Sequence, residues 1–218
     1  MIGLSQGREG AWPGGMSSWR LRKEFGSSAS MKASPQTRPR PAYCQAPDEG
    51  NMHTLLHWAT DEQKQKYLKP LCDGRAWSCF AMTEPEVAGS DPTLIRTHAH
   101  QDGEEWVING HKWFISNAHR ANFAILIART EDDPDLPQAA NTAFLVDIPS
   151  EGWNEVRQIE TMHGSTGHSE IVIEDLRVHE SQMLGGRGQG HLLGQYRLGP
   201  ARLAHCMRWI AQAETALD

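Results

Sequence analysis

Apolar and polar positions divide the chain into four parts. Residues 1–47 are rich in Gly, Ser and Pro and show no apolar period. Such a segment cannot bury enough surface to offset the entropy of ordering it, so we expect a disordered arm there. Residues 51–58 and 60–73 are typical of two short helices. In the second, Gln63 follows Thr60 by three residues, which is a capping-box pattern.

After Trp77 the pattern favours strands, at the spacing typical of a sandwich or barrel. Asp102-Gly103 and Asn109-Gly110 are turn pairs typical of hairpins, so we expect a hairpin at each. Residues 131–140 and 185–190 are predicted loops. The predicted strands cover residues 104–108, 111–116, 122–129, 141–148, 156–161, 170–173 and 177–179.

The last stretch, residues 191–218, turns helical because apolar residues recur there at steps of three and four. This stripe consists of Leu203, Cys206 with Met207, Ile210, Ala213 and Leu217. Burying one large apolar side chain is worth about 1.5–3 kcal/mol, so the stripe implies a partner helix, although the sequence ends at Asp218. The whole pattern predicts a mainly β middle domain, a sandwich or barrel of short antiparallel strands, flanked by α-helical segments.

Charge and cysteine content exclude several classes of protein. The formal net charge is −6, and residues 1–47 are basic, so the rest of the chain is strongly acidic and does not suit a nucleic-acid binder. The four cysteines show no CxxC spacing, and the longest apolar run, residues 121–128, is too short to span a bilayer. We expect a soluble intracellular protein without a membrane span. A transit peptide is the alternative for residues 1–47, which are rich in Ser and Arg.

Residues 80–91 form the most informative motif. They read FAMTEPEVAGSD, turn at Pro85 and continue through small residues, which let a flat ligand approach the backbone. From the residues alone, a structural turn is the default reading. The stretch resembles the TEPxxGSD flavin-loop signature of the acyl-CoA dehydrogenase family, with one more residue before the glycine. The resemblance implies that the cofactor is bound by Phe80, Ala81, Met82, Thr83, Glu84, Pro85, Glu86, Val87, Ala88, Gly89 and Ser90, and that Ser90 also contacts substrate.

A second motif, residues 108–117, reads INGHKWFISN. Alone it would be an ordinary hairpin with a buried aromatic side chain. It resembles the family's INGxKxWITN strand, whose Trp-Ile-Thr triplet packs on the flavin. The matching residues here are Phe114, Ile115 and Ser116, which keep an aromatic face and a hydroxyl. In the family that hydroxyl reaches flavin N5, the atom that accepts hydride.

A third motif, residues 198–208, reads LGPARLAHCMR. It resembles the opening of the family's C-terminal helical domain, and the resemblance implies acyl-CoA contacts for Gly199, Pro200, Ala201 and Arg202. A guanidinium such as that of Arg202 is suited to acidic or carbonyl oxygens. An arginine on a helix surface is the alternative.

The resemblance spans about residues 48–218 and implies an acyl-CoA dehydrogenase-like division into domains. Residues 1–47 are an atypical arm, and residues 48–76 are the end of an N-terminal helical domain. Residues 77–190 are a middle β-domain that faces FAD, and residues 191–218 are the first helix of a C-terminal helical domain.

The family's chemistry implies the cofactor, substrate and partners. In the family, a glutamate removes the α-proton of an acyl-CoA thioester and the β-hydrogen leaves as hydride to the flavin, giving a trans-2-enoyl-CoA. The resemblance therefore implies FAD as cofactor, an acyl-CoA as substrate and an electron-transfer flavoprotein as partner, with a homo-oligomer at full length. The compartment is the cytoplasm in a bacterium and the mitochondrion in a eukaryote.

The catalytic glutamate has no counterpart in this sequence. In most members it would lie beyond Asp218, and in a minority it lies beside the helix arginine, where Ala201 stands. We therefore assign no catalytic residue, and we expect the chain alone to bind FAD weakly or not at all and not to turn over. The alternatives are a split subunit that completes its site with a helical partner, a non-enzymatic β-domain, and a normal enzyme cut by a gene-model error.

The histidines predict no metal site. His53 and His57 lie four residues apart, a spacing compatible with a metal, but no Glu completes an HExxH pattern. We expect both to be surface residues, as we do for His98 and His100 on one strand face. His163 and His168 flank a Gly-rich turn, where a histidine could polarise a thioester.

Overall fold

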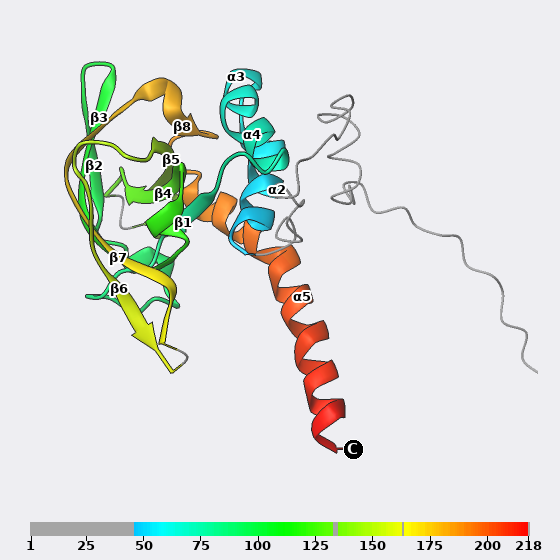
Figure 1. The fold of residues 1–218 in the computed structure, drawn as a ribbon. Helices are drawn as coiled ribbons and strands as arrows, with labels where there is room; N and C mark the ends of the chain where they lie inside the picture. The colour runs from blue at the N-terminus through cyan, green and yellow to red at the C-terminus, as the bar shows by residue number, and fades with distance from the viewer. Residues whose placement is uncertain (1–45, 133–134, 163, 218) are drawn as a thin grey trace, which may run out of the picture.

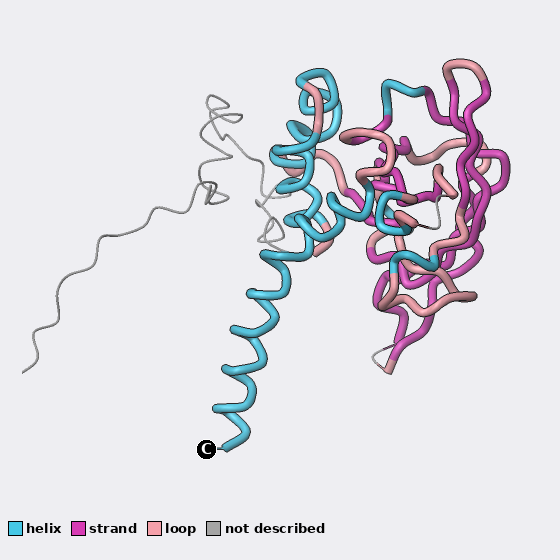
Figure 2. Tube along the Cα trace, turned by 180° about the vertical axis from the view of Figure 1, so that it is seen from behind, coloured by secondary structure: helices cyan, strands magenta, loops and turns pink. Residues whose placement is uncertain are grey.

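The structure is a computed structural model that describes residues 46–217, apart from residues 133, 134 and 163. Residues 1–45 of the predicted arm, His163 and Asp218 therefore lie outside the described residues. A twisted sheet forms one half of the molecule, and three short helices stand against one side of it (Figures 1 and 2). A long C-terminal helix begins beside the sheet, passes the short helices and continues away from both (Figure 1).

The short helices begin with α2 (Asp48–Trp58) and α3 (Asp61–Gln63). The predicted capping box is confirmed, because the Thr60 hydroxyl accepts from the Gln63 N–H and the Gln63 side chain accepts from the Thr60 N–H. A π-helical stretch, η2 (Lys64–Leu68), leads into α4 (Lys69–Cys72). Pro70 in α4 has no N–H to donate to the preceding turn, which fits a widened turn at this point.

In the described part of the chain, eight strands form one mixed sheet. In the order β6-β7-β3-β2-β4-β5-β8, neighbouring strands are hydrogen-bonded, and β1 pairs in parallel with β4. The other extended pairings are antiparallel, so the mainly β, mainly antiparallel class with flanking helices is confirmed. The strands are β1 (Ser78–Ala81), β2 (His98–Asp102), β3 (Glu105–Ser116), β4 (Phe123–Arg129), β5 (Asn141–Asp147), β6 (Trp153–Thr161), β7 (Gly164–His179) and β8 (Met183–Leu184).

One of the two predicted hairpins is wrong. Asp102-Gly103 does turn β2 into β3, with Gly103 at a φ of 66°. Asn109-Gly110 instead lies within the continuous strand β3, at a bulge where the register with β7 shifts. The Asn109 side chain accepts from the Asp175 N–H at 2.8 Å and donates to the Asp175 carboxylate at 3.0 Å, so it stabilises this bulge. The two strands predicted over 170–173 and 177–179 are likewise one strand, β7.

Two hydrophobic clusters lie on opposite faces of the central strand β4. Ala124, Leu126 and Ala128 contribute to a cluster formed largely by the strands. Phe123, Ile125 and Ile127 contribute to a second cluster, which also contains residues of α2 and α4. Burial of both faces explains why the sequence of β4 is a continuous apolar run rather than an alternating one.

The C-terminal helix α5 (Gly190–Leu217) is joined to the sheet and to α2 near its beginning. The guanidinium of Arg197 donates to the Asn51 side chain at 2.9 Å, and its carbon lies 4.2 Å from the centre of the Phe80 ring. Burial lowers the pKa of Arg197 to about 10, although Asp48 opposes this. Asn51 in turn donates to the Ser78 hydroxyl at 2.8 Å. These contacts fix the first half of α5 against α2 and β1.

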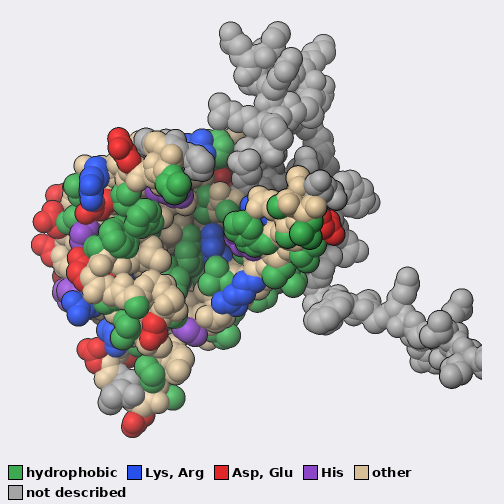
Figure 3. Space-filling view, turned by 90° about the horizontal axis from the view of Figure 1, so that it is seen from below, with side chains coloured by type: hydrophobic (Ala, Val, Ile, Leu, Met, Phe, Trp, Pro, Cys, Tyr) green, Lys and Arg blue, Asp and Glu red, His purple; other side chains and the backbone are tan. Residues whose placement is uncertain are grey.

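The second half of α5 projects away from the other elements. Hydrophobic side chains gather on this projecting helix (Figure 3). The predicted stripe is therefore present but exposed: Leu203 is 70% exposed, Met207 73% and Ile210 60%. In the described part of the chain, no helix combines the length and the apolar character needed to cross a membrane.

Candidate functional site

Two predicted motifs meet beside the end of β1. The Trp113 N–H donates to the Thr83 carbonyl at 3.0 Å, and the Thr83 hydroxyl donates to the Trp113 carbonyl at 2.7 Å. The loop that follows β1 is thereby held directly beside the Phe114, Ile115 and Ser116 triplet on β3. We call residues 85–90 the β1 loop; its last three residues, 88–90, are exposed.

Phe114 presents an aromatic ring to solvent next to this loop. Its side chain is 45% exposed, and its backbone has a φ of 52°, an uncommon conformation for a bulky residue. A shift in the β3–β7 register between Lys112 and Ile115 places Phe114 there. The ring meets Trp113 edge-on at a centroid distance of 4.9 Å. Strained backbone positions cluster at ligand sites, so the exposed Phe114 makes this surface a candidate ligand site.

The other two residues of the triplet have different surroundings. Ile115 is 1% exposed and packs in the hydrophobic cluster formed largely by the strands. This packing fixes β3 beneath Phe114. The Ser116 hydroxyl lies 2.9 Å from Nδ1 of His168 on β7. If His168 carries its proton on Nδ1, the imidazole donates to Ser116 and leaves the serine O–H free to donate outward.

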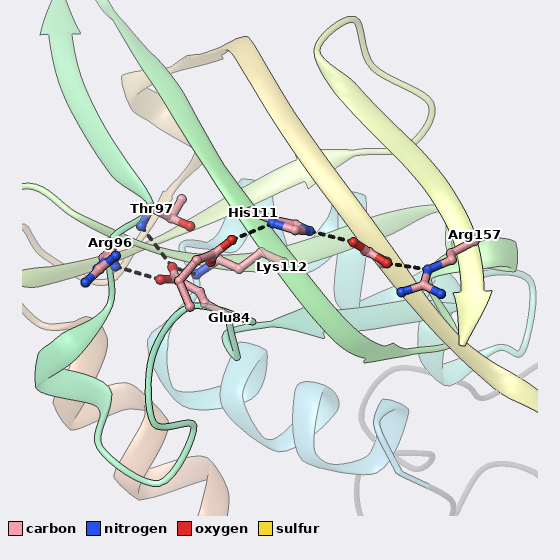
Figure 4. A network of polar contacts seen from close by, with 8 residues as sticks. Glu84, Arg96, Thr97, His111, Lys112 and Arg157 are labelled. Carbon is pink, nitrogen blue, oxygen red and sulfur yellow. Dashed lines mark hydrogen bonds and ion pairs between the residues drawn. The ribbon is translucent and has the colours of Figure 1, made fainter. Parts of the chain in front are cut away.

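Glu84, which precedes the β1 loop, points into the protein (Figure 4). Its carboxylate accepts from the backbone N–H groups of Arg96 at 2.7 Å and Thr97 at 2.9 Å, and from Nζ of Lys112 at 2.8 Å. Lys112 also donates to the Met82 carbonyl at 3.0 Å. The side chains of Glu84 and Lys112 are 1% and 0% exposed, so both are committed to anchoring the base of the loop.

Burial and pairing act on this ion pair in opposite directions. Burial raises the pKa of Glu84, but the Lys112 ammonium and the hydrogen bonds from Thr97 and Arg96 outweigh it and lower that pKa overall. Burial lowers the pKa of Lys112 to about 8, although Glu84 opposes this. At neutral pH both groups are therefore charged.

His111 lies next to Lys112 on β3 and faces the opposite side of the strand (Figure 4). Its Nδ1 is 2.7 Å from a carboxylate oxygen of Glu86 in the β1 loop, and its Nε2 is 2.8 Å from one of Glu170 on β7. Glu170 also accepts from Arg157 on β6 at 2.6 Å. Sequence reasoning missed His111, Lys112 and Glu170. Lys112 was detectable in principle, because a lysine at an inward strand position requires a buried carboxylate.

The remaining predicted residues of the first motif are divided between interior and surface. Ala81 packs in the strand cluster. Phe80 and Met82 pack at the edge of the second hydrophobic cluster, which contains residues of α2 and α4. The Phe80 ring also lies under the Arg197 guanidinium. Pro85 and Val87 are half-buried, and Glu86 is exposed. The loop tip and Phe114 thus supply the accessible surface.

The third motif is not joined to the first two in the described structure. Gly199, Pro200, Ala201 and Arg202 lie in α5, beyond the part that contacts β1. Arg202 is exposed and donates to the Gln195 side chain at 3.0 Å, within the same helix. The general base was expected beyond Asp218, and Asp218 itself already lies outside the described residues, so that expectation stays a prediction.

The surface formed by the β1 loop and the triplet fits a flavin. An isoalloxazine ring system is flat and apolar with a polar edge. The exposed Phe114 ring, the small residues Ala88 and Gly89, and the Ser116 hydroxyl provide an apolar face, close backbone approach and a polar contact. For metals, the described residues contain no cluster of three or more His, Cys, Asp or Glu that could hold an ion.

A family model and several sequence relatives relate the chain to the acyl-CoA dehydrogenases. The family model for the middle domain of acyl-CoA dehydrogenases matches residues 79–176. Acyl-CoA dehydrogenase family member 11 of Gallus gallus is 42% identical over 183 residues, covering 80% of this chain and 23% of that protein. The Mycobacterium tuberculosis protein named "Probable acyl-CoA dehydrogenase FadE2" is 39% identical over 198 residues, covering 89% of this chain and 49% of its own length.

Solved structures agree with the sequence relatives. A Mycobacterium abscessus protein assigned to the acyl-CoA dehydrogenases superposes with a TM-score of 0.74 at 36% identity, over 80% of this chain and 44% of its own. Butyryl-CoA dehydrogenase of Megasphaera elsdenii gives a TM-score of 0.62 at 29% identity, over 67% and 38% of the two chains. The chain therefore spans between about a quarter and a half of the length of these relatives.

Proposed function

Since the chain belongs to the acyl-CoA dehydrogenase family, we propose that its β-domain supplies the flavin-facing half of an FAD-dependent acyl-CoA dehydrogenase. The reaction is the α,β-dehydrogenation of an acyl-CoA thioester to a trans-2-enoyl-CoA. The observation that carries the proposal is the exposed Phe114 ring, held at a left-handed backbone position directly beside the β1 loop.

The residues of this chain bind and orient the flavin in the proposed site. Phe114 would provide an apolar face for the ring system, and the backbone of the β1 loop would allow close approach. The Ser116 hydroxyl, which lies 2.9 Å from Nδ1 of His168, would provide a polar contact. Bound FAD supplies the acceptor for the hydride that leaves the acyl chain. Glu84 and Lys112 contact none of these groups; they fix the backbone that does.

The substrate side of the proposal rests on Ser90 and on the α5 residues Gly199, Pro200, Ala201 and Arg202. We propose that they contact the acyl-CoA and that a segment outside this sequence, beyond Asp218, supplies the general base. Neither Glu84 nor Glu86 of the first motif serves as that base. Glu84 is buried against three donors and Glu86 is paired with His111. A base must reach the proton that it removes.

The partners and the compartment follow the family. We propose an electron-transfer flavoprotein as the electron acceptor and a homo-oligomer for the full-length protein. Among the structural relatives is a chain described under "Electron transferring flavoprotein of Acidaminococcus fermentans", which matches 67% of this chain at a TM-score of 0.62. Relatives occur in bacteria and in animals. The proposed compartment is accordingly cytoplasmic in a bacterium and mitochondrial in a eukaryote.

Equilibrium dialysis against FAD tests the flavin site. Of the two outcomes expected from the sequence, weak binding and none, the exposed Phe114 ring favours weak, saturable binding by the wild-type chain. We expect Phe114→Gly to weaken it about 2- to 10-fold, the range for loss of one aromatic contact. Glycine adopts the backbone conformation at position 114 without strain, so this variant keeps the fold. His100→Gln, a substitution of an exposed residue on β2, is the control and binds like wild type. No saturable binding by wild type, or equal binding by Phe114→Gly, contradicts the proposal.

A subunit that completes its flavin site with a helical partner is the second candidate function. The exposed apolar side chains of α5, among them Leu203, Met207 and Ile210, favour it. Light scattering after size-exclusion chromatography measures the mass of the purified chain. Leu203→Glu combined with Met207→Glu is expected to convert an associated species to a monomer. A wild-type chain that is already monomeric and does not bind a separately supplied helical partner contradicts this candidate.

A further inference from the structure

The bridge through His111 joins three separate parts of the β-domain. Glu86 comes from the β1 loop, His111 from β3, and Glu170 from β7. Arg157 on β6 completes the row by donating to Glu170. In Figure 4, dashed contacts run in one row from the labelled His111 to the labelled Arg157. Of these groups, only Glu86 belongs to a segment outside the sheet.

The bridge requires a charged imidazole. A carboxylate accepts hydrogen bonds and donates none, whereas a neutral imidazole donates from one nitrogen only. Both ring nitrogens of His111 lie within 2.8 Å of a carboxylate oxygen. A neutral ring would therefore place a nitrogen lone pair against a carboxylate lone pair at one end. Both contacts are satisfied together only when His111 carries two protons.

Loss of one proton releases the Glu86 end of the bridge. Glu170 is 14% exposed and stays paired with Arg157, so it remains in place whichever way the imidazole bonds. Glu86 is 43% exposed, and His111 is the ion-pair partner that the structure gives it. The neutral imidazole therefore keeps Glu170 and loses Glu86, since water can replace His111 at the exposed carboxylate.

We propose that His111 is a positioning residue that acts as a protonation-dependent latch, holding the β1 loop against β3 while charged and releasing it when neutral. The latched loop is the one that we assign to the flavin. The effect of the latch on flavin binding therefore rests on the proposed function. The two carboxylates raise the pKa of His111 overall, although burial by itself lowers it. The latch is accordingly closed at acidic and neutral pH and opens as the pH rises through that raised pKa.

The other charged groups near His111 do not change the conclusion that the latch opens as the pH rises. Lys112 and Glu84 lie on the opposite face of β3 and are paired with each other. On β7 and β6, Glu170 and Arg157 form a pair whose charges cancel. Glu155 on β6 accepts from the Ser169 hydroxyl at 2.7 Å rather than from the imidazole. Glu86 is therefore the group whose position depends on the proton of His111.

Nitrogen-15 NMR of the chain between pH 5.5 and pH 9 tests the latch. The imidazole signal of His111, assigned with His111→Gln, is expected to titrate above the ordinary value, and the amide signals of Glu86, Val87 and Ala88 are expected to shift with the same midpoint. Glu86→Gln lowers the His111 midpoint and removes the part of the loop-amide pH dependence that follows His111. His111→Arg, which keeps its charge throughout, removes the same part, and a shift that remains in both variants belongs to Lys112, whose pKa is about 8. His100→Gln changes none of these.

Two results overturn the latch. One is a set of loop amides that do not respond while His111 titrates. The other is a His111 midpoint that is the same in wild type and in Glu86→Gln. FAD dialysis on the same samples reports on the proposed function separately. A chain that binds no FAD at any pH removes that function, while the amide signals still decide whether the latch exists.

Discussion

Two neighbouring ion pairs hold the candidate flavin loop, and they differ mainly in burial. Glu84 and Lys112 are 1% and 0% exposed, whereas Glu86 and His111, each one or two positions away in sequence, are 43% and 31% exposed. Alternation along β3 sends Lys112 inward and His111 outward. The inner pair, Glu84 and Lys112, fixes the base of the loop because neither partner can be released into water. The outer pair, Glu86 and His111, is weaker because both partners are partly exposed and water can replace either one.

Removal of Lys112 tests the inner pair and has the largest expected effect on stability. Lys112→Met leaves the Glu84 carboxylate buried without its counter-ion, and we expect the free energy of unfolding to fall by about 3–5 kcal/mol. Urea denaturation measures it. The double variant Lys112→Met/Glu84→Gln is the matched control and recovers part of the loss, because no buried charge remains. A single variant as stable as wild type would show that the inner pair does not anchor the loop.

Gly110→Ala tests the backbone that carries both pairs. A Cβ at this position would lie 2.2 Å from the Thr97 hydroxyl oxygen, and the Thr97 N–H is one of the donors to Glu84. We expect a loss of about 1–3 kcal/mol in the free energy of unfolding, typical of overpacking. Gly194→Ala in α5, where a Cβ meets nothing within 4 Å, is the control and is neutral or slightly stabilising. Equal effects at the two glycines would contradict the close approach at Gly110.

The pH dependence of stability separates the outer pair from the inner one. The pKa of His111 is raised, so its contribution to stability is complete below about 6.5, the ordinary value, and disappears as the pH rises through the folded-state pKa. The pKa of Glu84 is lowered, so its contribution is present above about 4.3 and disappears as the pH falls through the folded-state pKa. Acidic pH therefore weakens the inner pair. Rising pH weakens the outer pair and, above the Lys112 pKa of about 8, also removes a charge from the inner pair.

Glu86→Gln isolates the contribution of the outer pair. We expect it to lower the free energy of unfolding by less than about 1 kcal/mol at pH 5.5, the range for an exposed pair, and by nothing measurable at pH 9. Urea denaturation of both proteins at the two pH values gives the difference. A loss that is the same at pH 5.5 and pH 9 would mean that His111 does not carry the effect.

The sequence predicts most of the fold because local signals agree with the tertiary structure. The capping box at Thr60, the turn at Asp102-Gly103 and the apolar run of β4 each appear as expected. The hairpin predicted at Asn109-Gly110 is wrong because the same residue pair is common in hairpin turns and in β-bulges. Only the distant contacts with Asp175 and Thr97 decide between them.

The candidate site is less predictable for a similar reason. The motifs locate the β1 loop and the Phe114 triplet in the chain, but the partners that hold them come from elsewhere. In the sequence, Lys112 is 28 residues away from Glu84, and Glu170 is 59 residues away from His111. A single sequence can indicate that Lys112 needs a buried carboxylate, but it does not say which carboxylate pairs with Lys112 or with His111. The role of Arg202 and its neighbours stays a prediction, because in the described structure they contact neither of the other motifs.

We propose that FAD binds at the β1 loop and the Phe114 triplet. The most direct test is an amide correlation NMR spectrum of the chain with and without millimolar FAD, which detects weak binding residue by residue. We expect saturable shifts concentrated in residues 83–90 and 114–116, with the β2–β3 turn unchanged. Shifts confined to other surfaces, or none at millimolar FAD, would contradict binding at this site.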